Sequence, residues 1–256
     1  MNELEVLGME YYELLGRQQF VAEHLDYKVL DRHRPALETM SQVNNCGITI
    51  FDMFKKEHVY TSYNFSEIFG YDLDSVSQQG NDYFNSRVHP DDFVGLMKNG
   101  ILILKFFHGL RQEERSHYKL VNEYRIMGNE SRYIRVIEQH QALELDTSGN
   151  VWLTLGVIDI SPDQTDLPGI KSQIFNYKTG RVVPLPATSE ELINLSKREK
   201  EVLQLVKDGY LSKEISEKLF ISVHTVNTHR QRIMEKLGAN NSLEAIAYAS
   251  RLGLMN

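Results

Sequence analysis

The sequence predicts an α+β protein in which a sheet-containing N-terminal domain precedes a C-terminal domain of four helices. Three β-rich segments, residues 118–127, 133–145 and 151–160, follow one another and are separated by turn residues, which is typical of antiparallel strands. From Leu195 onward, four successive stretches carry apolar residues at helical spacing, with no strand-like segment among them. The length of 256 residues is natural for two domains of moderate size.

The composition is that of an ordinary globular protein from a reducing compartment. Hydrophobic residues make up 41% of the chain and charged residues 25%. A single cysteine, Cys46, excludes an internal disulfide and fits the cytoplasm. The chain opens on no basic and apolar leader, and its longest apolar run, residues 101–107, is too short to span a bilayer. We therefore expect a cytoplasmic protein that makes no membrane contact.

Charge is divided unevenly along the chain. The formal net charge of −7 by itself argues against a nucleic-acid partner. From Leu195 onward, however, there are 10 Lys and Arg against 7 Asp and Glu, whereas the preceding residues hold 18 basic and 28 acidic side chains. This asymmetry indicates a modestly basic binding module attached to an acidic partner domain.

The most informative helix is predicted over residues 222–237. Val226, Ile233 and Leu237 lie seven and four residues apart and form one apolar stripe, and Ser222 is placed to cap the N-terminus. On this helix alone, an ordinary amphipathic surface helix is the alternative interpretation. Amide side chains on the other face suit bidentate bonds to adenine in a major groove. That face carries hydrogen-bonding side chains: His224, Asn227, Thr228, Gln231, Arg232 and Glu235.

The neighbouring segments favour a DNA-binding interpretation. A short helix, Ser212–Leu219, ends just before the long one, which is a helix–tight turn–helix arrangement. A capping box of Ser196 and Glu199 opens a helix before that. After the long helix, Gly238 is expected to end it and Ser242 to cap a last helix. In the first of these helices Val202, Leu203 and Val206 are predicted to lie inward, and the last helix holds Ala245, Ile246, Ala249 and Leu252.

The segments LSKREKEVLQLVKDG, KEISEKLFIS and TVNTHRQRIMEKLGA resemble the LuxR/GerE-type helix-turn-helix over residues 195–256. The resemblance implies a sequence-specific bacterial transcription regulator whose third helix, residues 222–237, enters the major groove of double-stranded DNA. It also implies that the second helix crosses the DNA backbone and the fourth mediates dimerisation. We place the domain at residues 193–256 and its helix-turn-helix core at 211–230. Carried over by alignment, the base-facing residues are Asn227, Thr228 and Gln231, and those that contact or steer toward phosphates are Thr225, His229, Arg232 and Lys236.

Three positions depart from the family's pattern. Leu211 lies where a Ser or Thr cap is usual, which leaves Ser212 to cap the second helix. Ser216 replaces a common small Ala in that helix. Ser242 stands where an Arg is frequent, so one phosphate contact of the family is put in question.

Residues 1–36 are predicted to form a leading amphipathic helical segment. Their apolar residues keep a helical period, and a helix of this kind packs on its own domain or on a partner's copy. The face of the last helix that carries Ala245, Ile246 and Ala249 leaves further apolar surface. Together these surfaces predict a homodimer.

Residues 37–163 carry strand and helix signals in a mixed order. Short strands at Gly47–Asp52 and 58–62 precede a helical turn and a longer helix that begins near Pro90, and the three long strands come last. Within this part, HVYTSYNFSEIFGYD and RVHPDDF resemble two stretches that recur in PAS domains. The resemblance implies a five-stranded antiparallel sheet with helices on one face, around a cavity that holds a ligand or is filled by side chains. It departs at Ser62, where the family commonly has Asn.

Residues that suggest a cofactor have structural explanations. His89 would suit a haem or metal, but it belongs to the PAS-like signature. Cys46 would suit a flavin-thiol photosensor, but it leads into a strand and not into the Asn-Cys-Arg-Phe-type helix. Asp91 and Asp92 fit a helix start, where the helix dipole favours acidic side chains. We predict no coloured cofactor and no bound metal. The aromatic residues predicted to lie in the core are Phe65, Phe69, Tyr133 and Trp152.

Residues 164–192 are predicted to link the two domains. Two β-rich stretches flank Lys178-Thr179-Gly180, a hairpin signal, and prolines stiffen the exit, so a change in the first domain could alter the spacing of the second. The chain shows no phosphate loop, no nucleophile with a positioned His and no metal-spaced cluster, so an enzyme is not expected. Two hypotheses for the PAS-like domain stay open: a sensor of a small ligand or protein partner, or a dimerisation and docking module without a ligand.

Overall fold

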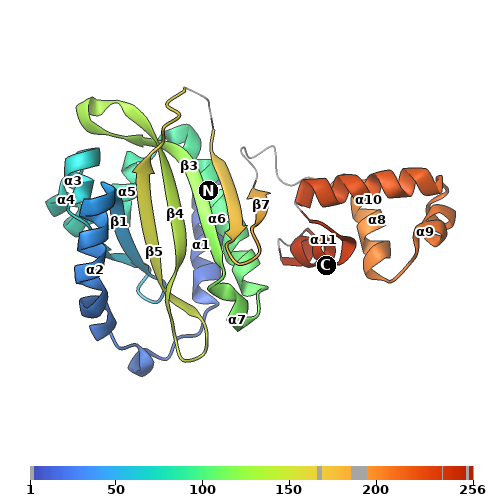
Figure 1. The fold of residues 1–256 in the computed structure, drawn as a ribbon, viewed down its shortest axis with the longest axis horizontal. Helices are drawn as coiled ribbons and strands as arrows, with labels where there is room; N and C mark the ends of the chain where they lie inside the picture. Colours follow the sequence, from blue (N-terminus) through green and yellow to red (C-terminus); the bar gives the residue numbers. More distant parts are fainter. Residues whose placement is uncertain (1–2, 166–168, 186–194, 238, 252–253, 256) are drawn as a thin grey trace.

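The computed structural model describes residues 3–165, 169–185, 195–237, 239–251 and 254–255 (Figure 1). A large sheet-containing domain lies beside a smaller helical domain. None of the helices in the described ranges is long and apolar enough to cross a membrane. The elements of the larger domain are α1 (Glu3–Gly16), η1 (Ala22–His24), α2 (Lys28–Asn44), β1 (Gly47–Asp52), β2 (Glu57–Thr61), α3 (Asn64–Phe69), α4 (Leu73–Gln79), α5 (Asn81–Arg87), α6 (Pro90–His108), α7 (Gln112–Arg115), β3 (Tyr118–Met127), η2 (Asn129–Ser131), β4 (Tyr133–Leu145), β5 (Val151–Ile160), β6 (Lys171–Asn176) and β7 (Arg181–Leu185).

The strands form one antiparallel sheet in the order β2-β1-β5-β4-β3-β6-β7. The first five of this order, with α3 to α6 inserted between β2 and β3, form the PAS-like part, so the predicted fold class is confirmed. The three long strands have the bounds that the sequence predicts. The hairpin of β6 and β7 pairs with β3 and extends the same sheet.

Helices lie on both faces of the sheet, but on one face α2 covers only the region of β1. Figure 1 shows α1 and α6 behind the sheet and α2 in front of β1. We call the face of the sheet toward α6 the inner face. On it, the register puts Leu120 opposite His140 and His140 opposite Gly156. The opposite face packs on α2 through a cluster that includes Val29, Leu37, Ile48, Ile50 and Trp152.

The leading helical segment is interrupted and then runs further than expected. A break after Gly16 separates α1 from α2, and α2 continues through Pro35 to Asn44. Proline removes one backbone N–H and normally breaks a helix. Here tertiary contacts outweigh that cost, because α2 buries Leu37 and Ser41, and Ser41 O accepts a bond from the Asn64 amide at 2.7 Å. The helix ends at Asn45, which adopts the left-handed conformation.

The helical domain contains α8 (Lys197–Lys207), α9 (Ser212–Leu219), α10 (Val223–Leu237) and α11 (Ser242–Arg251), as the sequence predicts. The apolar stripe of α10 is fully inside. At the N-terminus of α8 the capping box is complete: the Ser196 N–H donates to the Glu199 carboxylate and the Glu199 N–H donates to Ser196 Oγ. At the start of α10, Ser222 Oγ accepts from the Thr225 N–H at 3.0 Å. Gly238 and Leu252 lie outside the described residues. The buried residues that the four helices share are Val202, Leu203, Ile215, Val226, Ile233, Leu237, Ala245 and Ala249.

Two predicted caps are wrong. Ser212 is inside α9, whose start is instead satisfied by Glu214, which accepts from the Leu211 N–H at 2.7 Å. Ser242 is inside α11, and Asn241 Oδ1 accepts from the Glu244 N–H at 3.0 Å in its place. Both serine hydroxyls are engaged elsewhere, as described below.

The two domains touch through α11. The face of α11 that carries Ala245, Tyr248 and Ala249, here called the α11 face, is buried against α8, α10 and α6. The rings of Tyr248 and Phe106 on α6 are 6.3 Å apart, and Arg181 of β7 forms an ion pair with Glu244. The surface expected from Ala245 and Ala249 for a partner is therefore covered within the chain, which corrects that part of the dimer prediction.

Candidate nucleic-acid interface and sensor cavity

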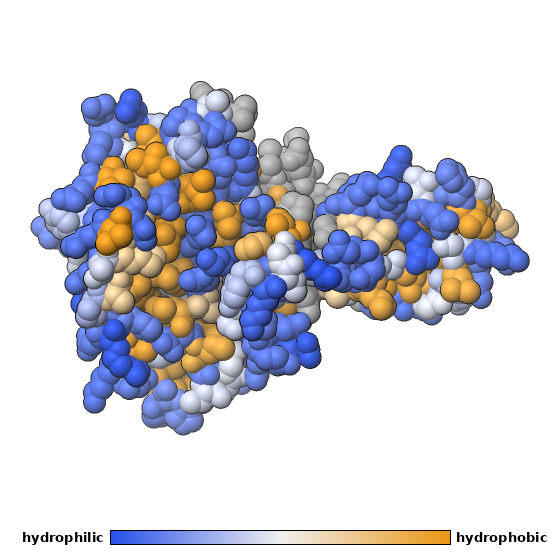
Figure 2. All heavy atoms as spheres, viewed as in Figure 1, coloured by the Kyte–Doolittle hydropathy of each residue, from blue (hydrophilic) through white to orange (hydrophobic). Residues whose placement is uncertain are grey.

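The long helix α10 separates an apolar and a polar face. Val226, Ile233 and Leu237 are buried, whereas Asn227 and Gln231 are exposed one turn apart. The outer edge of α10 is mainly hydrophilic in Figure 2. This division places the amide side chains where another molecule can contact them without disturbing the core.

The three residues predicted to face bases differ in how they are held. Gln231 donates from its amide to Glu235 at 3.0 Å, and Thr228 donates from its hydroxyl to the His224 carbonyl at 3.0 Å. Asn227 and Gln231 line a shallow hollow beside the start of α11. Both exposed amides have a donor and an acceptor, so this surface has the chemistry for reading a base edge.

The residues predicted to meet phosphates are less uniform. Arg232 is exposed, as a phosphate contact requires. Thr225 is half-buried and its hydroxyl lies 2.8 Å from that of Ser222. His229 is half-buried, with a buried Nδ1 that has no partner among the described residues. The fourth residue, Lys236, is held by the domain itself.

Lys236 Nζ lies 2.7 Å from Glu199 Oε2, and the Glu199 side chain is only 4% exposed. Burial works to raise the pKa of Glu199, but hydrogen bonds from Lys236 and Ser196 outweigh it and hold that pKa below the ordinary value. Lys236 therefore stabilises the contact of α10 with α8. Its phosphate contact stays a prediction.

Arg230 is a residue that sequence reasoning missed. One guanidinium nitrogen donates to Ser212 Oγ of α9 and another to Ser242 Oγ of α11, each at 2.9 Å. Arg230 thus ties three helices together and explains why neither serine serves as a cap. The partners lie 18 and 12 residues away, and no local spacing rule links them.

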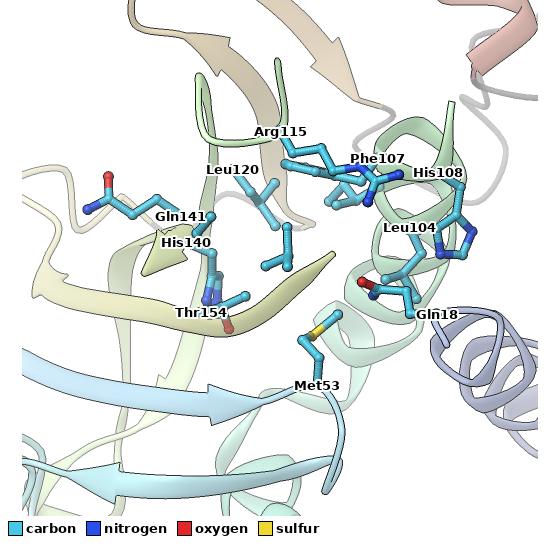
Figure 3. Close-up of a pocket in the computed structure, with 13 residues that line it drawn as sticks. Gln18, Met53, Leu104, Phe107, His108, Arg115, Leu120, His140, Gln141 and Thr154 are labelled. Atoms are coloured by element: carbon cyan, nitrogen blue, oxygen red, sulfur yellow. The ribbon is translucent and has the colours of Figure 1, made fainter. Parts of the chain in front are cut away.

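The larger domain contains a partly open cavity of about 90 Å³ between α6 and the inner face of the sheet (Figure 3). Its wall is mainly apolar and includes Ile103, Leu104 and Phe107 of α6. Arg115 of α7 and His108 at the end of α6 also line it. A pocket of this kind, with few polar groups on an apolar wall, is typical of small-ligand sites.

Beside the cavity, His140 forms a half-buried network on the inner face. Its Nε2 lies 3.0 Å from the Glu138 carboxylate, to which Tyr124 donates at 2.9 Å. Burial works to lower the pKa of His140, but the Glu138 carboxylate outweighs it and raises that pKa. Burial likewise works to raise the pKa of Glu138, which His140 and Tyr124 nevertheless hold below its ordinary value.

The residues that suggested cofactors have the following places. His89 caps α6, with Nδ1 accepting from the Asp91 N–H at 3.2 Å, and Cys46 is buried just before β1. Asp92 does more than start a helix, because it is fully buried and binds the Arg125 guanidinium at 2.7 and 3.0 Å. No group of three potential metal ligands occurs within the described ranges.

The aromatic core prediction is partly wrong. Phe65, Phe69 and Trp152 are buried, as predicted, but Tyr133 is 40% exposed. Tyr133 begins β4, next to the turn that holds η2, and its ring packs against the His89 ring at a centroid distance of 4.4 Å. Its aromatic side chain therefore covers the start of α6 from outside.

A helix-turn-helix with an exposed amide-bearing helix defines a DNA-binding domain. Residues 193–249 match the family of bacterial regulatory proteins of the luxR family, so the chain has a C-terminal luxR-type domain. The oxygen regulatory protein NreC of Staphylococcus aureus strain bovine RF122 / ET3-1 is 48% identical over 68 residues, which are 27% of this chain and 31% of the relative. NreC of strain JH9 is 47% identical over the same length. This chain thus matches about a third of the length of these relatives.

Solved structures resemble more of the chain at lower similarity. The phage VqmA-DPO complex is 19% identical, covers 87% of this chain and 90% of its own, and has a TM-score of 0.32. The Vibrio cholerae VqmA dimer without target DNA is 16% identical, with coverages of 81% and 83% and a TM-score of 0.28. TM-scores this low do not establish a shared arrangement of domains.

Proposed function

We propose that this protein is a sequence-specific, DNA-binding transcription regulator that acts as a homodimer and whose DNA affinity is controlled through its PAS-like domain. One observation carries the proposal: α10 exposes Asn227 and Gln231 opposite a buried stripe, in a domain that matches the luxR family. The proposal assigns no catalytic role. Its expected place is the cytoplasm, where bacterial DNA is accessible.

The interface residues fall into two groups under this proposal. Asn227, Thr228 and Gln231 read base edges, since their side chains offer both donors and acceptors. Thr225, His229, Arg232 and Lys236 contact or steer toward phosphates, which sets position and affinity but not sequence preference. Lys236 also binds Glu199, so its contact with a phosphate competes with that bond.

The helix α6 supports control through the PAS-like domain, since one helix serves both sites. Leu104 and Phe107 line the cavity, while Phe106, next to Phe107 in the chain, is buried and contacts Tyr248 of α11. A ligand that displaces α6 therefore acts directly on α11. No intervening chain of residues is needed.

The α11 face supports a specific form of control. The family resemblance assigns dimerisation to the fourth helix, but α6 and β7 cover part of α11 here. Ala245 and Ala249 belong to the core of the four helices, whereas Tyr248 and Glu244 contact α6 and β7. A dimer that uses the surface of α11 around Tyr248 and Glu244 and the contact with α6 exclude each other. We therefore propose that release of α11 from α6 permits the DNA-binding dimer.

In vitro selection of DNA fragments by the full-length protein, followed by anisotropy titrations, tests this function. We expect one enriched operator with two half-sites, and a loss of preference among operator variants in Gln231→Ala. Arg232→Ala is the matched control on the same helix and should weaken all sequences alike. Failure to enrich any sequence above the starting pool would refute the proposal.

A further inference from the structure

The cavity beside α6 is small and partly open. Its volume is about 90 Å³. One water needs only about 10–15 Å³ of such space, so the cavity can hold a small organic molecule.

Two nitrogen atoms of its lining residues are buried without a hydrogen-bond partner among the described residues. They are Arg115 Nε and His108 Nε2. Buried polar groups are almost always satisfied in native proteins, so each unpartnered one needs an explanation. A ligand that offers one acceptor group to both atoms supplies it.

Arg115 brings a positive charge to this end of the cavity. Arg115 Nη1 donates to the Gly149 carbonyl at 2.9 Å and to Asn150 Oδ1 at 3.2 Å, and both acceptors are neutral. Within the described part of the chain, no carboxylate forms an ion pair with Arg115. Burial lowers the pKa of His108, and the charges of Arg115 and Arg17 lower it further, so His108 adds no second charge at neutral pH.

We propose that the cavity binds a small monocarboxylate whose carboxylate accepts from Arg115 Nε and His108 Nε2. Its apolar body lies against Leu104 and Phe107 of α6. Neutral His108 carries a hydrogen on Nε2 in one of its two tautomers, so His108 Nε2 and Arg115 Nε can both donate to the carboxylate. The inference rests on the proposed sensor function and names the ligand class for that same site.

Matched acids and amides test the assignment on the full-length protein. Benzoate and benzamide, and the shorter pair butyrate and butyramide, have equal numbers of non-hydrogen atoms and differ in charge. The Arg115 Nε–H resonance, identified by its loss in Arg115→Lys, should shift saturably with at least one of the acids. The same acid should raise the thermal unfolding midpoint, and its amide should change neither quantity.

Three variants separate the site from general effects. Arg115→Gln should weaken binding of the acid at least tenfold, whereas Arg111→Gln should not change it, because Arg111 is 72% exposed and lies outside the cavity. Since Arg115→Gln also removes the bonds to Gly149 and Asn150, Ala142→Leu serves as a second test. It fills the cavity and leaves Arg115 intact, and its melting curve shows whether it folds.

Several outcomes would overturn the proposal. Equal affinity for an acid and its amide would show that the site recognises a hydrogen-bond acceptor and does not recognise a negative charge. If none of the acids binds, or if Ala142→Leu binds the acid as well as wild type does, the cavity is not a carboxylate site. Operator affinity measured on the same samples keeps the two questions apart, because specific DNA binding without acid binding refutes only the ligand class.

Discussion

Replacing Lys236 by Met tests whether α10 is held by its half-buried ion pair with Glu199. Methionine keeps the apolar stem of the side chain and removes the ammonium group that lies 2.7 Å from Glu199. Glu199 is then left with the Ser196 N–H at 2.7 Å and a side chain that is 4% exposed. The carboxylate is too enclosed to recover its hydration.

The loss of stability in Lys236→Met lies between two limits. Breaking a fully buried pair costs about 3–5 kcal/mol, and a surface pair is worth about 0–1 kcal/mol. Lys236 is 41% exposed while Glu199 is enclosed, so the loss should match a hydrogen bond to a charged group, about 1.5–3 kcal/mol at pH 7. Native-state hydrogen exchange of α8 and α10 amides measures it in the full-length protein.

The pH dependence follows from the lowered pKa of Glu199. A carboxyl with a depressed folded-state pKa contributes stability that is fully present above its ordinary pKa of 4.5 and is lost as the pH falls through the folded-state value. The deficit of Lys236→Met should therefore shrink below pH 4.5. Arg232→Met, an exposed cation on the same helix, should change stability by less than about 0.5 kcal/mol. A Lys236→Met protein as stable as wild type at pH 7, or a deficit that persists undiminished at low pH, would refute the reasoning.

Three further predictions concern the DNA-binding surface, the core and the domain contact. Gln231→Ala should flatten the preference among operator variants by about 1–3 kcal/mol per lost bidentate pair and leave the salt dependence of DNA affinity nearly unchanged. Arg232→Ala should instead reduce the slope of log affinity against log salt concentration by about one per subunit. The opposite pattern would mean that α10 is rotated in the groove. Ile233→Ala should cost roughly 2–5 kcal/mol, because the side chain is 2% exposed, and a loss below 1 kcal/mol in the same exchange assay would contradict its place in the core. Arg181→Gln removes the ion pair of β7 with Glu244, leaves the α11 face intact and should raise the dimer fraction in sedimentation without DNA, and an unchanged fraction would contradict the proposed competition.

The sheet could be predicted closely because local signals and tertiary structure agree there. Residues 118–127 form β3 with the expected bounds, since turn residues follow the strand and β-favouring side chains fill it. The end of the leading helical segment could not be predicted, because Pro35 argues locally for a break while packing of Leu37 on the sheet holds the helix through it.

At the DNA-binding surface, the apolar stripe and the exposed amides followed from helical spacing alone. The roles of Ser212 and Ser242 did not, because Arg230 reaches both from another helix. Lys236 looks like a free surface cation in the sequence, and only the approach of α8 reveals its partner. The unpartnered nitrogens of Arg115 and His108 had no signal at all, since their meeting depends on how α6, α7 and the strands assemble.

The covered α11 face has a consequence for how the protein responds to its own abundance. A contact within one chain acts at an effective concentration in the millimolar range, whereas a second copy is present only at its cellular level. Under the proposed competition, α6 holds the advantage over a second copy until expression rises or a ligand weakens the α6 contact. Gene dosage and ligand would then be interchangeable inputs, and overproduction alone would change the expression of target genes in the absence of any signal.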